Sequence, residues 1–493
     1  MSITATKLKE TNYPSNPLYF RLLAYLVDKR VFSFEVSDRK YLLYTVDLLL
    51  VLSAAFLYGT RAVPDLAIQQ MTTAHYWYFV PIVVFWSFFS YVFDLYNLEK
   101  INNFYTTVKY VFIASTLTVA SYVLFPWFTP PLPSRFTIIL FYFTLLSPLA
   151  IWRYIYSRLL DSPLFLKRVL IVGSSWSSNA LIDVFANGDI FNYHLGYKIV
   201  GVIDEDSSNT IYKGVRIING TSNITKLAKR LKIDEIIVDE TKNKDNNEVS
   251  IRELTNCRKA GIAVTTLPDF YEYLTGRVLV HNTARDFSLA FPYNRNQYKT
   301  AYLFFSRALD VAFGVCGVLL CLLFMPLVYI ANLLGSKGPL FYSQERVGLY
   351  GKTFKIVKFR SMVVDAEKDG AAWAQKNDSR ITEVGKILRR SRIDELPQAW
   401  SVLKGDMSLI GPRPERPVFV EQLKNEIPFY DTRHLTKPGI TGWAQAIYKY
   451  GSNSDDALMK VQYDLYYLKN RSFMMDIKVL LKTISVVVRF KGM

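Results

Sequence analysis

Two adjacent carboxylates follow a run of arginines in the segment from Arg389 to Glu415. Asp394 and Glu395 stand just after three arginines, and a Gly-Pro-Arg-Pro-Glu turn comes further along. This pattern is typical of sites that handle metal ions and phosphates together, because a carboxylate can hold a hard cation or attack phosphorus while guanidinium groups bind phosphate oxygens. The alternative is a solvated helix start with weak surface ion pairs. Surface pairs explain the whole run poorly, so we expect a functional site.

A second basic motif precedes the acidic pair. Lys358 and Arg360 occupy alternate positions in Lys-Phe-Arg, in a strand pattern that follows a turn bracketed by Gly348 and Gly351. Alternate residues of a strand point to the same face. We therefore expect both basic side chains to enter one pocket.

The bulk composition limits the classes of partner. The chain has 493 residues, so two or three domains are expected, and apolar residues make up 51% of it. The net charge of +17 suits nucleic acid, anionic lipid or phosphorylated substrates. The apolar segments favour the last two, and no nucleic-acid partner is expected. The three cysteines lack CxxC spacing and the four histidines are scattered, which predicts neither a disulfide framework nor a zinc site.

Four apolar stretches occupy the region 41–160, each near the ~20 residues that cross a bilayer as a helix. They are Tyr41–Tyr58, Trp77–Tyr96, Val108–Phe125 and Phe136–Tyr156. Basic residues crowd the N-terminal segment 1–40 and recur from Arg153 onward, while the third connection carries no charge. The positive-inside rule then predicts a multi-pass protein of the inner (cell) membrane, with its N-terminus and everything after Arg158 in the cytoplasm.

Alternating strand and helix patterns follow over 165–276. They predict a parallel α/β sheet. The turn after the first strand has only Gly173 where a dinucleotide fingerprint needs several glycines, so we expect a degenerate Rossmann-like domain. A scaffold or regulatory role, with a possible homodimer through this domain, is our interpretation. A linker is predicted over 277–300.

A long apolar run precedes the basic and acidic motifs. Pro326 interrupts it, and basic residues flank both of its ends. A crossing here would leave the phosphate-handling residues outside, so the region 305–336 is predicted to be a re-entrant helix hairpin that enters one leaflet, in contact with membrane lipids. Arg307 and Asp310 lie one helical turn apart and are predicted to pair.

Taken together, the KFRSM, DELPQ and GPRPE blocks make the region 301–493 closely similar to bacterial polyprenyl-phosphate hexose-1-phosphate transferases. The implied fold is an α+β membrane protein with four N-terminal transmembrane helices, a degenerate Rossmann-like domain and a C-terminal catalytic domain with a re-entrant membrane helix. The implied reaction moves a sugar-1-phosphate from a UDP-sugar to undecaprenyl phosphate and releases UMP. It is the first membrane step of exopolysaccharide, capsule or O-antigen synthesis.

The resemblance also implies residue roles. Asp394 would be the nucleophile that carries the phosphosugar covalently, and Glu395 its partner, with Mg²⁺ held by the pair. Arg413, with Glu415 in the same motif, would bind the substrate diphosphate, and Lys358 and Arg360 would share that pocket. Arg389 would serve the polyprenol phosphate. Two motifs depart from the family pattern: Met325-Pro326 replaces Ser-Pro, and Asp378-Ser379-Arg380 replaces Asp-Pro-Arg.

Two alternatives stay open. A membrane-tethered nucleotide-sugar dehydratase or epimerase shares the N-terminal architecture, but it needs an intact glycine-rich motif and a Tyr-x-x-x-Lys, neither of which occurs after Ala301. A non-enzymatic scaffold of the same pathway is the other. The sugar that is transferred cannot be read from these motifs.

Overall fold

The structure is a computed structural model of the chain. It describes residues 36–62, 77–97, 104–125, 135–159, 166–173, 176–186, 196–204, 211–218, 223–239, 247–280, 300–335, 338–366, 378–448 and 454–488. Most of the predicted segment 1–40 and of the predicted linker 277–300 lies outside these residues.

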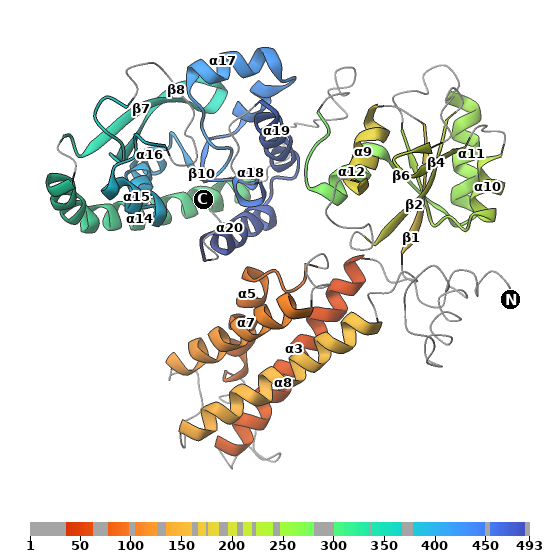
Figure 1. Cartoon of the computed structure of the whole chain (residues 1–493), viewed down its shortest axis with the longest axis horizontal. Helices are drawn as coiled ribbons and strands as arrows, with labels where there is room; N and C mark the ends of the chain where they lie inside the picture. The colour runs from red at the N-terminus through yellow and green to blue at the C-terminus, as the bar shows by residue number, and fades with distance from the viewer. Residues whose placement is uncertain are drawn as a thin grey trace. The chain divides into compact units, whose positions relative to one another are not determined.

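Contacts divide the chain into two compact units, whose helices and strands are labelled in Figure 1. The first contains the N-terminal helices and most of the middle sheet, over Met1–Ser174, Asn179–Ile237 and Asn246–Val264. The second contains the acidic pair, over Ser175–Ser178, Val238–Asp245 and Thr265–Met493.

The N-terminal region forms a bundle of four apolar helices, in which α3 packs on α5 and α8, and α7 packs on α5 and α8. They are α3 (Val36–Ala62), α5 (Phe79–Val92), α7 (Phe104–Leu124) and α8 (Arg135–Leu159). Three of them contain segments long and apolar enough to cross a membrane: Asp38–Gly59, Tyr105–Leu124 and Phe136–Ser157.

Helix α5 is shorter than predicted. It has 14 residues, which at about 1.5 Å per residue gives roughly 21 Å, less than the ~30 Å of a hydrocarbon core. The predicted stretch Trp77–Tyr96 loses its last turn because the chain leaves the helix at Phe93 and Asp94 takes a left-handed φ of 53°.

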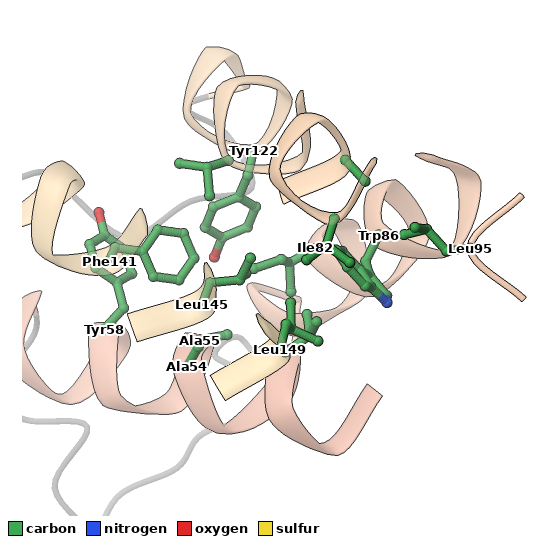
Figure 2. Close-up of a cluster of buried hydrophobic side chains, with 14 of the residues drawn as sticks. Ala54, Ala55, Tyr58, Ile82, Trp86, Leu95, Tyr122, Phe141, Leu145 and Leu149 are labelled. Atoms are coloured by element: carbon green, nitrogen blue, oxygen red, sulfur yellow. The ribbon is translucent and has the colours of Figure 1, made fainter. Parts of the chain in front are cut away.

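Aromatic and aliphatic side chains fill the bundle interior (Figure 2). Ile82 and Trp86 of α5 are fully buried, as are Phe141 and Leu145 of α8. The rings of Tyr58 and Phe141 lie 4.5 Å apart between centroids. Lipid tails are as apolar as these side chains, so close packing rather than the hydrophobic effect holds such helices together in a bilayer.

One ion pair is enclosed in this bundle. Arg153 Nη2 of α8 lies 2.5 Å from Asp47 Oδ2 of α3, and neither side chain is exposed. The Tyr96 hydroxyl donates to the same oxygen at 3.0 Å. A charge inside a bilayer is costly without a partner, so the pair determines which faces of α3 and α8 meet. Arg153 is therefore an interior residue rather than one of the flanking charges counted for orientation.

The middle region is a six-stranded sheet in the order β3-β4-β2-β1-β5-β6. The strands are β1 (Lys167–Val172), β2 (Tyr197–Ile203), β3 (Ile211–Tyr212), β4 (Val215–Ile218), β5 (Glu235–Val238) and β6 (Ala263–Thr266), with helices α9 (Trp176–Ala186), α10 (Ile224–Arg230) and α11 (Asn247–Lys259) between them. Strand β2 pairs in parallel with β1 and β4, and β3 pairs antiparallel with β4. The parallel α/β pattern predicted for this region is present.

The second unit combines short strands with helices. Its elements are α12 (Leu267–Thr275), α14 (Thr300–Gly335), β7 (Phe341–Val347), η6 (Leu349–Gly351), β8 (Thr353–Phe359), α15 (Glu383–Ser391), η7 (Ile393–Gln398), α16 (Ala399–Lys404), β9 (Ser408–Ile410), α17 (Pro417–Glu426), η8 (Tyr430–Leu435), β10 (Gly439–Thr441), α18 (Trp443–Ile447), α19 (Ser454–Lys469) and α20 (Phe473–Val488). Val278 and Val280, in the predicted linker, pack in a core with Leu423 and Leu465 of α17 and α19.

Helix α14 contacts the rest of this unit along its whole length. At its start the Tyr302 hydroxyl donates to Asp476 of α20 at 2.7 Å. In its middle Gly317 leaves no room for a side chain, since a Cβ there would lie 2.6 Å from the Cβ of Ala399 in α16. Val328 packs with Phe359 and Leu388 in the same core cluster.

The other face of α14 is apolar and exposed. Phe304, Leu319, Leu323 and Leu334 are each more than 60% exposed, and the helix is the fourth candidate membrane span of the described residues. The helix has 36 residues and continues through Pro326. The predicted division into two helices at this proline is therefore not seen: the lost N–H removes one backbone hydrogen bond, and the flanking turns stay helical.

The predicted pair between Arg307 and Asp310 is wrong. Arg307 donates to the carbonyl oxygens of Val402 and Leu403 at 2.8 and 2.7 Å, which satisfies the C-terminal end of α16. Asp310 accepts from the Ser408 hydroxyl at 2.9 Å and from the backbone N–H of Leu409 at 2.7 Å. Both residues have a structural role, but each joins α14 to other elements of the second unit instead of pairing with the other.

Candidate active site

Helix α15 brings the first arginine of the motif to the loop that follows β8. Thr382 caps the helix by accepting from the N–H of Gly385 at 2.9 Å. Gly385 allows a close approach, since a Cβ there would lie 1.9 Å from the carbonyl oxygen of Ser361. Arg389, one turn further along α15, donates through Nε to the Ser361 hydroxyl at 2.9 Å.

Arg392 connects α15 to the short 3-10 helix η7, which carries the acidic pair. Its φ of 59° is left-handed, a conformation that costs a residue with a Cβ about 1 kcal/mol or more. This reversal directs the chain into η7, where Asp394 is 7% exposed. Pro397 lies inside η7 rather than in the first turn of an α-helix.

Glu395 is held by two cations that come from different parts of the chain. Lys358 Nζ of β8 lies 3.1 Å from Glu395 Oε1, and Arg413 Nη2 lies 2.8 Å from the same oxygen. Burial alone raises the pKa of Glu395, but Arg413 and Lys358 outweigh it and hold that pKa well below its usual value. Glu395 is therefore ionised at neutral pH and fixed in orientation.

Asp394 is in the opposite electrostatic situation. Burial, and then the charge of Glu395, raise its pKa to about 6, although Lys358, Arg389 and Arg392 oppose the rise. Its Oδ1 is buried and has no hydrogen-bond partner in the described part of the chain. Two neighbouring acids whose pKa values are pushed apart are typical of catalytic pairs. Asp394 is the acid with a free oxygen and the higher basicity.

The site carries more positive than negative charge. Four cations lower the pKa of one or both carboxylates: Lys358, Arg389, Arg392 and Arg413. Burial lowers the pKa of Lys358, and the charge of Glu395 opposes that change. The surplus of two positive charges favours an anionic ligand. The central expectation from the sequence, an acidic pair beside arginines, is met in this geometry.

Arg360 donates to the backbone near the end of β8. It is 5% exposed, and its described hydrogen bonds go to backbone carbonyl oxygens, at 2.7 Å for Pro339 and 3.3 Å for Met362. The alternation argument places it beside Lys358, but β8 ends at Phe359. Beyond that point the two-residue period of a strand no longer applies.

Glu415 is the last residue of the Gly-Pro-Arg-Pro-Glu turn and contacts Arg346. Its Oε2 is 3.6 Å from Arg346 Nη1 of β7, and its carbonyl oxygen accepts from the N–H of Val347 at 2.8 Å. A small pocket lies beside the turn and is lined by Val347, Gly348, Pro412, Arg413, Pro414, Arg433, His434, Thr436 and Pro438.

Three residues of the site are not among those predicted. Arg392 acts on both carboxylates, and the arginine run that contains it is the signal that could have found it. Arg346 and Arg433 bind the turn that carries Arg413. No spacing in the sequence links either of them to Arg413, and only the tertiary structure brings them to the turn.

The acidic side chains of the site suit Mg²⁺ in part. No group of three or more His, Cys, Asp or Glu side chains suited to a metal occurs in the described residues. Mg²⁺ often needs only one or two carboxylates plus substrate phosphates and water, and the buried, unpartnered Oδ1 of Asp394 fits such a ligand. Glu395 fits less well, because two cations already hold its Oε1.

An acidic pair among cations, on a unit with a long apolar helix, defines a membrane-associated enzyme that handles phosphate groups. Residues 301–490 match the family described as bacterial sugar transferase. This match and the relatives below show that the chain belongs to that family.

Three relatives are reported. The UDP-N-acetylgalactosamine-undecaprenyl-phosphate N-acetylgalactosaminephosphotransferase of Aeromonas hydrophila is 42% identical over 48% of this chain and 55% of its own length. A putative undecaprenyl-phosphate N-acetylgalactosaminyl 1-phosphate transferase of Bacillus subtilis is 49% identical over 31% of this chain and 86% of its own. The undecaprenyl-phosphate galactose phosphotransferase of Salmonella typhimurium is 30% identical over 71% of each chain. The match thus spans about half of the Aeromonas protein.

Proposed function

We propose that this enzyme transfers a sugar-1-phosphate from a UDP-sugar to undecaprenyl phosphate and releases UMP. The observation that carries the proposal is Asp394, a buried acid with an unpartnered oxygen and a raised pKa, set among cations next to an ionised Glu395. The names of the relatives support the substrates.

The reaction takes two displacements. An oxygen of Asp394 attacks the phosphorus that bears the sugar, and the bond from that phosphorus to the bridging oxygen breaks, so UMP leaves with the electron pair. A phosphate oxygen of undecaprenyl phosphate then attacks the aspartyl-bound phosphorus and releases the carboxylate. Splitting the transfer lets one site serve a soluble and a lipid substrate in turn. A pKa of about 6 leaves Asp394 ionised at neutral pH and more basic than an ordinary aspartate.

The cations divide between the substrates in this proposal. Arg413 and Lys358 bind the diphosphate of the UDP-sugar, beside the pocket next to the Gly-Pro-Arg-Pro-Glu turn, where Glu415 contributes. Arg389, on α15, serves the undecaprenyl phosphate. Arg360, which we expected in this pocket, is assigned a structural role because its described bonds hold the backbone of the neighbouring loop.

Mg²⁺ is part of the proposal. Asp394 would hold it together with the substrate phosphates, and Glu395 would act mainly through its charge. When bound, the ion would offset negative charge on the diphosphate. In this chain Lys358 and Arg413 supply a further part of that charge compensation.

We also propose that α14 lies in the inner leaflet with both ends on the cytoplasmic side, next to the catalytic unit. Its 36 residues extend over roughly 54 Å at about 1.5 Å per residue, more than a bilayer core needs. Contacts near both ends, at Tyr302 and at Gly335 with Val384, go to the same unit. A helix that crossed the bilayer would carry one end away from that unit. A homodimer through the middle sheet stays a prediction.

The test is an assay of the purified full chain for UMP release from a panel of UDP-sugars. N-acetylgalactosamine comes first, since two of the relatives carry it in their names. We expect release over many turnovers that requires undecaprenyl phosphate and Mg²⁺. When the lipid is left out, release should stop at about one UMP per enzyme, with radiolabel from the sugar phosphate on Asp394. A dehydratase or epimerase would alter the sugar without releasing UMP, and a scaffold would do neither.

A further inference from the structure

The turn Gly411–Arg416 carries Arg413 but has no regular secondary structure of its own. Pro412 and Pro414 lack backbone N–H groups, so the turn is held mainly through its carbonyl oxygens. Two of these accept from backbone N–H groups: Pro412 from Gly439 at 2.9 Å and Glu415 from Val347 at 2.8 Å.

The carbonyl oxygens of Arg413 and Pro414, which lie between Pro412 and Glu415, accept from arginine side chains. Arg433 Nη2 donates to the carbonyl oxygen of Arg413 at 3.1 Å. Arg346 Nη1 donates to the carbonyl oxygen of Pro414 at 3.1 Å. The four successive carbonyl groups from Pro412 to Glu415 therefore have four different donors. Those of Arg413 and Pro414 are held by guanidinium groups.

Arg433 is itself fixed from two sides. Its Nη2 lies 2.7 Å from Asp464 Oδ2 of α19, and these two side chains are 6% and 2% exposed. Its Nη1 donates to the Tyr430 hydroxyl at 2.9 Å. Asp464 balances the charge of Arg433, so this arginine is suited to holding the backbone and not to binding an anionic substrate.

Arg346 has a similar set of contacts nearer the surface. It donates to the side-chain oxygen of Gln344 at 2.6 Å and lies 3.6 Å from Glu415, and its side chain is 18% exposed. The planar guanidinium fork lets each arginine hold a carbonyl group and an acidic or amide group at once, which an ammonium does less well.

We infer that Arg433 and Arg346 are positioning residues for the transfer reaction: they hold the turn so that the Arg413 guanidinium reaches Glu395 and the substrate diphosphate. This inference rests on the proposed function, because it needs Arg413 to act on the substrate. A displacement on the order of 1 Å in such a group can lower a rate about 100-fold.

The test is a set of double-mutant cycles in the full-length enzyme. Arg413→Met, Arg433→Lys and Arg346→Met are made singly, and the last two are also made in the Arg413→Met background. We expect kcat/KM to fall about 100-fold for Arg413→Met and about 10-fold for each of the others alone. In the Arg413→Met background, Arg433→Lys and Arg346→Met should change kcat/KM by less than about 2-fold, because their effect passes through Arg413.

Arg258→Met is the matched control, since Arg258 also donates to a carbonyl oxygen, that of Val264 at 3.2 Å, in the other unit. Its kcat/KM should equal that of the wild type. If Arg433→Lys does not fold, Arg346→Met decides, because its side chain is nearer the surface. If Arg433→Lys and Arg346→Met lower kcat/KM as much in the Arg413→Met background as they do alone, the inference is overturned and the proposed function still stands. Full activity of Arg413→Met would overturn the role of Arg413 and the inference with it.

Discussion

The N-terminal bundle and the candidate active site both bury aspartates beside arginines, but they balance charge differently. In the bundle one Arg153 meets one Asp47, and neither side chain is exposed. In the site four cations surround two carboxylates, and Arg413 is 32% exposed. A balanced, enclosed pair joins two helices. An unbalanced, partly open cluster needs an anion to complete it.

The strongest test of this contrast is Asp394→Asn. We expect turnover to fall at least about 1,000-fold, because an amide cannot attack phosphorus or leave as a carboxylate. The measurement is UMP release with undecaprenyl phosphate present. The matched control is Asp406→Asn, an acid in the same unit that pairs with exposed Lys404 and should keep full activity. Wild-type turnover in Asp394→Asn would end its assignment as nucleophile.

Breaking the Arg153–Asp47 pair of the bundle should lower stability and leave turnover nearly unchanged. Asp47→Ala leaves Arg153 buried without its partner, and we expect a loss of about 3–5 kcal/mol in stability. The double variant Asp47→Leu with Arg153→Met should recover most of it, since no charge stays buried. Stability is followed by thermal unfolding in detergent, and turnover per folded molecule should stay near wild type. A double variant less stable than Asp47→Ala would show that the pair does more than balance charge.

The raised pKa of Asp394 predicts that replacing this aspartate with asparagine stabilises the fold at neutral pH. An unfolded aspartate titrates near 3.8 and the folded one near 6, so the folded state binds the proton more tightly. The wild type therefore loses stability as the pH rises from about 4 to about 6, by roughly 2–3 kcal/mol.

Asp394→Asn lacks this titration. Its stability relative to wild type should increase by that amount between about pH 4 and pH 7.5, measured without Mg²⁺ or substrate. A constant difference across this range would mean that the pKa of Asp394 is not raised.

The smallest expected effect concerns the surplus of charge. Arg392→Gln removes one of four cations, and we expect kcat/KM to fall by about 5-fold. Arg392 lowers the pKa of Asp394, so its loss should move the acid limb of the pH–rate profile to higher pH. Lys386→Gln is the control, because Lys386 is 60% exposed and pairs with Glu383 on the same helix. An acid limb that moves to lower pH would contradict the proposed electrostatics.

Local patterns predicted the elements well where one residue type decides them. The β-branched runs of the middle region form β1, β2, β4, β5 and β6, because β-branched side chains pack well on the pleated surface of a strand. The cap of α10 is Asn223, which accepts from the N–H of Lys226 at 3.0 Å, as is common for asparagine at the start of a helix.

The site was predicted less completely. Lys358 and Arg413 lie at Glu395 as motif reasoning expects, whereas Arg360 faces backbone carbonyl groups. Arg307 and Asp310 have helical spacing for a pair, yet each forms hydrogen bonds to residues distant in the chain instead. Such contacts join residues about 95–100 positions apart, and no periodicity in the sequence records them.

The sequence by itself determined the apolar helices, the strands of the middle region and the position of Asp394 and Glu395 just after three arginines, since each depends on residues close together in the chain. Only the tertiary structure decided that Asp394 would have the higher pKa of the two acids and Glu395 the lower. The reason is physical: burial and charge over a few ångströms set the two pKa values, and Lys358 and Arg413 reach Glu395 from elements on either side of it in the chain.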